Sequence, residues 1–472
     1  MLLLFLFILV CACLIAVSSH QHALIAILVI GFIQDPFRKL VPGEPIYFIV
    51  TVGIVFGLLL CKTVNRVGIN GIKIPFIYWM DLLRKPISLF LIILAIQFFH
   101  SLLRWGNVFV SLIGLLSYIA PFLAIIVGYY AINNISEVRR FMKVYVLFGL
   151  VLAISVALSF AGYDLSIFRE IGVGLKIYDQ GTVLRSFSGF MRTGEIAAWH
   201  LATTICFIII LYSTSERKPS ILVTLLLIAF LLFVMTFTGR RKMLMLVTLF
   251  GAFFVFAFFY YQKTLSLVSV VLSCTLVVCL WAIYEYFFFA GYNDDVQYYL
   301  ARSSSVYSNA TTRFWELGIN PLKWAYNRVG LLGGGLGIAS QGAHFFQSNS
   351  IAGGSGEGGF GKVMVELGLP GLLILIWLAF SMIRYILRCL NLASQHFVDS
   401  KLLVLVLGVS AFLIVNAMTF SVATQLYGDF FVLILLGLVS GFVFSLPKLV
   451  VIDLEQGKHN NVSTNVKKRF RT

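Results

Sequence analysis

Two arginines in one polar segment could do the chemistry of anion binding. Arg185 and Arg192 lie within Val183–Glu195, where small hydroxyl residues lead directly into an apolar run. A guanidinium group can hold a phosphate through two parallel hydrogen bonds. A loop that enters a helix adds free N–H groups and the positive end of the helix dipole. Arg192 could instead pair with Glu195, whereas Arg185 has no evident local partner, so Arg185 is the stronger candidate for a phosphate ligand.

A second basic group, Arg240 and Arg241, stands in the short turn Thr238–Lys242 between two apolar runs. An arginine left at mid-membrane costs roughly 2.5–3.5 kcal/mol on insertion scales. These side chains must therefore snorkel to the interface or face a polar cavity that holds an anionic partner. Both interpretations stay open. We favour an anion site, because so short a turn leaves the side chains little freedom.

Two further side chains could act as a base. His344 lies in the long polar segment Tyr292–Lys362, and an imidazole that is neutral near pH 7 suits general-base catalysis. Glu357, in the stretch Gly356–Gly359, is a second candidate. A packed histidine and a capping glutamate are the simpler alternatives for these two. The sequence shows no ligand spacing typical of a metal site, and we expect neither a metal nor another cofactor.

The elements that must position these residues are membrane-spanning helices. The chain is 60% hydrophobic and only 11% charged, with a mean hydropathy of +0.97. A soluble domain carries about 25% charged residues. Long apolar runs satisfy their own backbone hydrogen bonds in lipid only as helices. The sequence therefore predicts an all-α polytopic membrane protein.

The apolar runs predict about twelve or thirteen spans. His22–Ile33 is short for a span, so the first two runs could form one broken element or a shallow hairpin. The expected spans are Leu2–Val17, His22–Ile33, Pro45–Cys61, Pro86–Leu103, Val108–Ile132, Val144–Ala161, Ile196–Tyr212, Ile221–Phe237, Met243–Tyr261, Leu265–Ala290, Val363–Phe380, Leu402–Phe420 and Phe430–Phe444.

Basic residues indicate the orientation of these spans. With the C-terminal tail inside, the inner connections hold twenty basic and six acidic residues, and the outer ones fifteen and thirteen. The net charge of +16 is thus largely a topology signal, which needs no nucleic-acid partner. We expect helices over 1–290 with an outer loop at 162–195, a large outer loop at 291–362, C-terminal spans over 363–446 and a basic cytoplasmic tail at 447–472.

The large outer loop is expected to be partly helical. Ala310–Val329 spaces its apolar residues as an amphipathic helical pair that is broken at Pro321. The glycine cluster Gly333–Gly337 follows. It allows a tight backbone path, but no strand–helix–strand pattern surrounds it, and a nucleotide site is not indicated.

In order, these features resemble the O-antigen ligase and polysaccharide polymerase superfamily of bacterial inner-membrane proteins. The resemblance covers roughly residues 140–385, and the N-terminal third resembles the family only as generic spans. The residues that carry it are Arg185-Ser186-Phe187-Ser188-Gly189-Phe190, the turn Thr238-Gly239-Arg240-Arg241, Arg313-Phe314-Trp315 leading to the glycine cluster, and Glu366-Leu367-Gly368-Leu369-Pro370-Gly371.

The resemblance implies glycosyl transfer at the periplasmic face of the inner membrane. The donor would be a glycan on a polyprenyl pyrophosphate, and the acceptor a sugar hydroxyl on a glycan or a lipid. Arg185 and Arg240, with Arg241, would hold the pyrophosphate, Arg313 would position the donor or the loop, and His344 would activate the acceptor. The reaction would need no metal, and a chain-length regulator is a further candidate partner.

Alternatives remain at this stage. In ligases the loop histidine usually stands close to the next span, whereas here a glycine-rich stretch follows His344 and reaches Gly361. This departure favours a polymerase over a ligase and leaves Glu357 as an alternative base. A transporter of lipid-linked oligosaccharides should show charges within its spans, and here the charges gather at the outer side. The remaining hypothesis is a membrane scaffold protein that has no catalytic activity.

Overall fold

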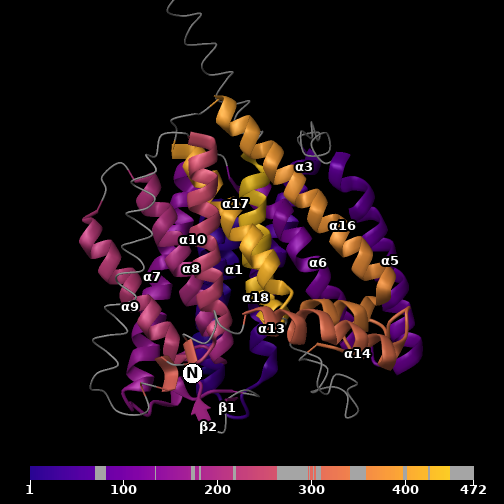
Figure 1. Cartoon of the computed structure of the whole chain (residues 1–472), viewed down its shortest axis with the longest axis horizontal. Coiled ribbons are helices and arrows are strands. Elements are labelled where there is room, and N and C mark those ends of the chain that lie inside the picture. The colour runs from indigo at the N-terminus through magenta and orange to yellow at the C-terminus, as the bar shows by residue number, and fades with distance from the viewer. Residues whose placement is uncertain are drawn as a thin grey trace, which may run out of the picture.

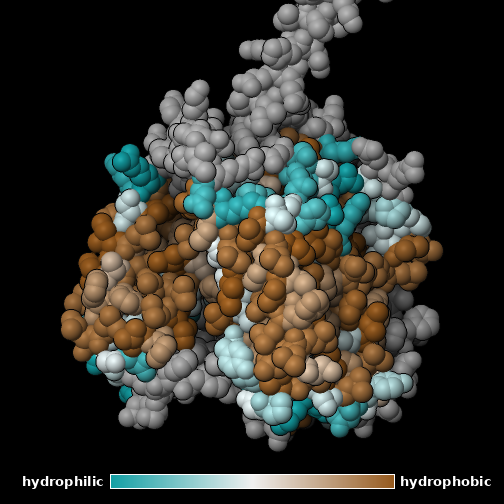
Figure 2. Space-filling view, turned by 180° about the vertical axis from the view of Figure 1, so that it is seen from behind, coloured by the Kyte–Doolittle hydropathy of each residue, from teal (hydrophilic) through white to brown (hydrophobic). Residues whose placement is uncertain are grey.

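The computed structural model describes residues 1–69, 81–132, 134–171, 176–179, 182–215, 219–262, 296, 298–300, 302–303, 310–340, 358–396, 401–423 and 426–446. The predicted fold class is confirmed: the chain is an all-α polytopic membrane protein. Seen from one side, a broad apolar band is flanked above and below by hydrophilic residues, as a membrane span requires (Figure 2).

Among the described residues, eight helices are long and apolar enough to cross a membrane. They are α3 (Thr51–Ile69), α5 (Asp81–Trp105), α6 (Val108–Ala131), α7 (Ile135–Phe160), α8 (Gly194–Thr214), α10 (Arg241–Gln262), α16 (Gly359–His396) and α17 (Lys401–Phe420). Three shorter apolar helices accompany them: α1 (Leu2–Ser18), α9 (Ile221–Phe237) and α18 (Phe430–Phe444). The expected span Leu265–Ala290 lies outside the described residues.

The N-terminal stretch forms two helices, α1 and α2 (His20–Leu40), joined through the extended residue Ser19. The second helix continues well past Ile33, where the apolar run ends. Its last turns bury Gln34, Asp35, Arg38 and Lys39, and the last three find polar partners elsewhere in the chain. A hydropathy criterion ends the helix too early, because it cannot register polar residues that are satisfied by distant segments.

The bundle is closed by tight contacts between α6 and α18. Cβ atoms added at Gly128 and Gly437 would overlap the carbonyl oxygens of Leu438 and Pro121, respectively. Small residues allow two helix backbones to approach this closely, and such contacts favour helix association in lipid. The C-terminal helix α18 thereby packs into the middle of the bundle (Figure 1).

One end of the bundle carries the polar elements, and we call it the hairpin end. It holds the antiparallel strands β1 (Lys176–Asp179) and β2 (Thr182–Arg185), paired with Ile177 opposite Leu184. It also holds α13 (Ala310–Phe314), a π-helix (Trp315–Ile319) and α14 (Asn320–Val329), which lie across the helix ends (Figure 1). Three short 3₁₀ turns complete the described elements: η1 (Ile46–Val50), η2 (Ser166–Phe168) and η4 (Leu426–Gly428).

The amphipathic helix expected near Pro321 is present, but it is not broken at the proline. Pro321 lies in the first turn of α14, where a missing N–H loses no helical hydrogen bond. Pro321 and Ala325 are buried one turn apart, whereas Lys323 and Arg328 are exposed. The irregularity is the π-helix that precedes the proline.

The glycine cluster is a packing element. Gln97 and Trp105 of α5 donate to the carbonyls of Leu332 and Gly334, at 2.7 Å and 2.8 Å. The Gly334 N–H donates to the Val365 carbonyl at 2.7 Å. The Glu366 carboxylate accepts from the Ala339 N–H and from the hydroxyl of Tyr118 in α6. The loop is thus held among α5, α6 and α16, and several of its backbone groups are committed to these contacts rather than available to a phosphate.

Glu366 is fully buried and holds two elements together. Its Oε2 accepts from the Tyr118 hydroxyl at 2.7 Å, and its Oε1 from the Ala339 N–H. Two residues further, Gly368 interrupts α16 with φ of 70°. At that point the Leu369 N–H donates to the Leu331 carbonyl at 2.8 Å. The Glu366–Gly371 motif therefore has a local structural role: it holds the segment that contains the glycine cluster against α16.

Gly337→Ala is expected to destabilise the protein by about 3 kcal/mol. Gly337 has φ of +85°, and an added Cβ would overlap the carbonyl oxygen of Val110. Gly330→Ala is the matched control, because Gly330 has φ of +77° with nothing within 4 Å of an added Cβ. Thermal unfolding in detergent should show a clearly larger loss for Gly337→Ala. Equal losses would mean that loop packing contributes nothing.

Candidate anion-binding site

Two segments that carry candidate arginines dock against each other at the hairpin end. The Phe187 N–H donates to the Phe237 carbonyl at 3.3 Å, and the Ser186 hydroxyl donates to the Thr238 carbonyl at 2.9 Å. Gly194 permits this approach, since an added Cβ would overlap the Ser186 hydroxyl. The backbones that bear Arg185 and Arg240 are thereby fixed side by side.

A short described piece of the large loop ties the same two backbones together. The Tyr299 hydroxyl donates to the Arg185 carbonyl, and Arg302 Nε donates to the Gly239 carbonyl at 3.2 Å. The Tyr299 ring lies near the rings of Phe160 and Phe237, with centroids 6.0 Å and 6.1 Å away. The described piece of the large loop therefore contributes directly to the structure of this site.

One carboxyl group, Glu170, lies within electrostatic range of both arginines. Burial raises the pKa of Glu170 to about 7, and Arg185, Lys39 and Arg240, in that order, oppose the rise. The Ser188 backbone N–H also favours the carboxylate, although neither buried oxygen accepts a hydrogen bond of good geometry. Three cations from three separate elements thus act electrostatically on one carboxyl group.

Lys39 approaches this group from the last turn of α2, beyond the apolar part of that helix. Its Nζ donates to the carbonyls of Gly189 and Met191, at 2.9 Å and 2.6 Å, and the residue is 8% exposed. These bonds hold the loop between β2 and α8 against α2. Lys39 adds a third positive charge near Glu170, on which Arg185 and Arg240 also act.

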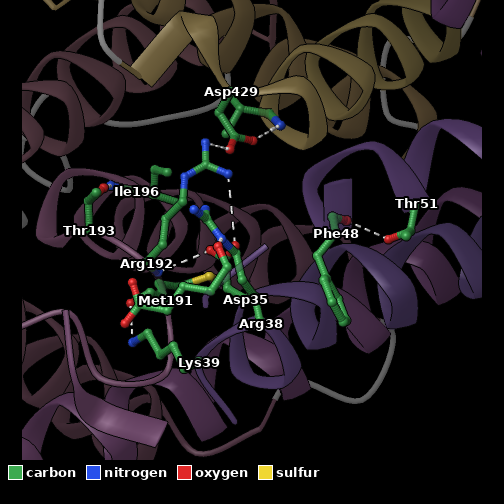
Figure 3. Close-up of polar contacts among 12 residues, drawn as sticks. Asp35, Arg38, Lys39, Phe48, Thr51, Met191, Arg192, Thr193, Ile196 and Asp429 are labelled. Carbon is green, nitrogen blue, oxygen red and sulfur yellow. Dashed lines mark hydrogen bonds and ion pairs between the residues drawn. The ribbon is translucent and has the colours of Figure 1, made fainter. Parts of the chain in front are cut away.

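Behind this group lies a buried ion triad, Asp35, Arg192 and Asp429 (Figure 3). Arg192 Nη1 is 3.8 Å from Asp35 Oδ1, and its Nη2 donates to Asp429. The Arg192 N–H also donates to Asp35 Oδ2 at 3.0 Å, and Asp429 caps α18 by accepting from the Val432 N–H at 2.8 Å. Burial acts to lower the pKa of Arg192, but the charges of Asp429 and Asp35 outweigh it and raise that pKa above its ordinary value.

The triad corrects one expectation. A local ion pair between Arg192 and Glu195 is wrong as an account of Arg192, because that guanidinium pairs with Asp35 and Asp429. Asp35 is distant in sequence, and Asp429 more so. Arg192 is consequently a structural cation rather than a phosphate ligand.

The structure places the predicted site residues as follows. Arg185 ends β2 with an exposed side chain, its Cζ 5.3 Å from the centre of the Phe187 ring, and Arg240 is half-buried nearby. Arg241, also half-buried, opens α10. Arg313 lies in α13, but its side chain is outside the described part of the chain, as are His344 and Glu357 entirely. Among the predicted residues that the structure describes, Arg185 and Arg240 both act on the carboxyl group of Glu170.

Sequence reasoning missed Lys39 and Glu170. The run Asp35-Pro36-Phe37-Arg38-Lys39 after an apolar stretch carries the same signal as the turn with Arg240, namely charge concentrated on the expected outer side. It could have been found by that criterion. Glu170 carries no comparable signal, since a single glutamate in an outer loop is ordinary.

No protein-family model and no curated protein matches this chain. Its chemistry must therefore be argued from the site. Within the described ranges, no group of three or more His, Cys, Asp and Glu side chains is arranged to hold a metal ion. What the site offers is three cations from separate elements that act on one carboxyl group, and clustered cations are the usual means by which proteins hold compact anions.

Proposed function

We propose that this protein transfers a glycan from a polyprenyl pyrophosphate to a sugar hydroxyl, as a polymerase of polysaccharide repeat units in the O-antigen ligase and polymerase superfamily. One observation supports this most. Arg185 and Arg240, far apart in sequence, share a carboxyl neighbour at the membrane-flanking end of the bundle, with Lys39 as a third cation. A lipid-linked pyrophosphate presents two negative charges at that depth.

The chemistry follows from the donor. The acceptor hydroxyl attacks the anomeric carbon, the bond from that carbon to the pyrophosphate oxygen breaks, and the hydroxyl proton passes to a base. Arg185 and Arg240 would stabilise the charge that develops on the departing pyrophosphate. His344 is the base that the resemblance implies, with Glu357 as its alternative, and Arg313 would position the donor. The activated donor drives the reaction without a nucleotide sugar.

The proposed location is the bacterial inner membrane, with the hairpin end on the periplasmic side. Support comes from the excess of basic residues in the opposite connections and in the C-terminal tail. A ligase that moves finished glycan to a lipid or protein uses the same donor chemistry and is the nearest alternative. The glycine-rich stretch after His344 favours the polymerase.

The lipid-linked glycan profile of a deletion strain tests this function. Loss of a polymerase leaves single repeat units on the lipid carrier, because each unit is made and exported but not joined. Loss of a ligase instead leaves long chains that are not attached to their acceptor. Mass spectrometry of extracted lipid-linked glycans separates the two, and an unchanged profile would contradict both.

A further inference from the structure

Glu170 lies within electrostatic range of Lys39, Arg185 and Arg240, the three cations that would hold an anion. Lys39 comes from α2, Arg185 from β2 and Arg240 from the turn after α9, and all three act on this carboxyl group. Both of its oxygens are buried, and neither accepts a hydrogen bond of good geometry from the described residues. An ionised Glu170 balances part of the positive charge of the three cations and would repel an incoming phosphate.

We propose that a pyrophosphate entering this site displaces the negative charge of Glu170, so that binding of the anion takes up one proton from solvent onto the Glu170 carboxylate. The inference rests on the proposed function, because it takes Arg185 and Arg240 as ligands of the lipid pyrophosphate. Two like charges in one partly buried site are unfavourable, and protonating the carboxylate removes one of them. Anion binding and protonation then favour each other to the same extent.

The charged groups around Glu170 decide the direction of the effect. The pKa of Glu170 is raised to about 7, so this group loses its proton across the neutral range. Burial lowers the pKa of Lys39 to about 8, while Asp35, Glu170 and Glu44 oppose this. Arg169, next in the chain, pairs with Glu44 at 3.9 Å. Rising pH therefore weakens anion binding first through Glu170 and then, above about pH 8, through Lys39.

The test uses a donor analogue whose own charge does not change with pH, so that any pH dependence of binding comes from the protein. Geranyl diphosphoglucose is a pyrophosphate diester, and both of its phosphates remain singly ionised across the neutral range. Its binding to the purified full-length protein in detergent would be measured by titration calorimetry. For a pKa near 7, affinity should fall about fourfold between about pH 6 and about pH 7.5. Lys39 remains mostly protonated over that interval.

Glu170→Gln imitates the protonated carboxyl group. It should bind the analogue at least as tightly as the native protein does at about pH 6, with no change up to about pH 7.5. Asp164→Asn is the matched control, because Asp164 is an exposed carboxylate in the same outer segment. It should keep the native pH dependence. Calorimetry in buffers of different ionisation enthalpy should also show a proton taken up by the native protein but not by Glu170→Gln.

The outcomes separate this inference from the function on which it rests. Binding that requires Arg185 and Arg240 but is independent of pH in the native protein overturns the role of Glu170 and leaves the proposed function standing. Weakened binding by Glu170→Gln also overturns it, since Glu170 would then be holding the cations in place. Binding that is indifferent to Arg185→Ala and Arg240→Ala contradicts the proposed function itself.

Discussion

Arg185→Ala and Arg240→Ala are each expected to lower the rate of glycan transfer by about 10²–10³-fold, while the protein still inserts into the membrane. Each arginine would stabilise charge on the departing pyrophosphate, and that charge is greatest in the transition state. Arg185 is exposed and Arg240 half-buried, so neither truncation should prevent folding. The measurement is glycan chain length in complemented deletion strains, with the amount of membrane-inserted protein as reference.

Arg169→Ala is the control for this experiment. Arg169 is at the same end of the bundle, and its side chain is 77% exposed, with one long ion pair to Glu44. Exposed pairs of this kind contribute little to stability, so its loss should leave chain length unchanged. Arg185→Lys keeps the positive charge but cannot form two parallel hydrogen bonds to a phosphate, so it should retain only part of the activity. Normal chain lengths in Arg185→Ala and Arg240→Ala would remove the basis for a pyrophosphate site.

The second large effect concerns stability. Arg192→Met is expected to destabilise the protein by about 3–5 kcal/mol, because it leaves two carboxylates buried without their cation. Asp35 and Asp429 are each 2% exposed and lie on either side of this guanidinium. The triad also joins the end of α2 to the start of α18, so its loss should loosen both helices. Thermal unfolding of the purified protein in detergent measures the change.

A charge-neutral variant tests whether the buried charge is the cause. Arg192→Met combined with Asp35→Asn and Asp429→Asn should recover most of the stability, since the three positions of the triad then carry no buried charge. Asparagine at position 429 can still cap α18 as aspartate does. A triple variant as unstable as Arg192→Met would show that shape and hydrogen bonding, rather than charge, determine the effect. Arg169→Met should change nothing in the same assay.

Local patterns in the sequence were sufficient for several features. Apolar runs such as Val108–Ile132 and Leu402–Phe420 correspond closely to α6 and α17, because a helix in lipid must be apolar over its own length. The amphipathic spacing of Ala310–Val329 likewise identified the helices across the hairpin end. Arg185 and Arg240 were notable because basic residues on the expected outer side run against the usual charge bias. These are properties of neighbouring residues.

Other features depend on contacts between distant residues, and here local reasoning failed. Arg192 pairs with Asp35 and Asp429 rather than with its neighbour Glu195, and Lys39 donates to carbonyls on the loop after β2. The length of α2 followed from those partners and not from hydropathy. The glycine cluster proved to be a packing element for the same reason, since its neighbours come from α5, α6 and α16.

The amino-acid sequence determined the class of this protein and most of its spans, and it singled out Arg185 and Arg240 as candidates for an anion site. Composition, hydropathy and charge bias are properties of short stretches of residues, so the sequence alone is enough to recognise them. The tertiary structure decided which charges meet: it separated Arg192 into a structural triad and gathered Lys39, Arg185 and Arg240 around Glu170. The triad forms because buried charges need partners, which the fold supplies from distant segments. The spacing of residues in the sequence does not indicate which partners these are.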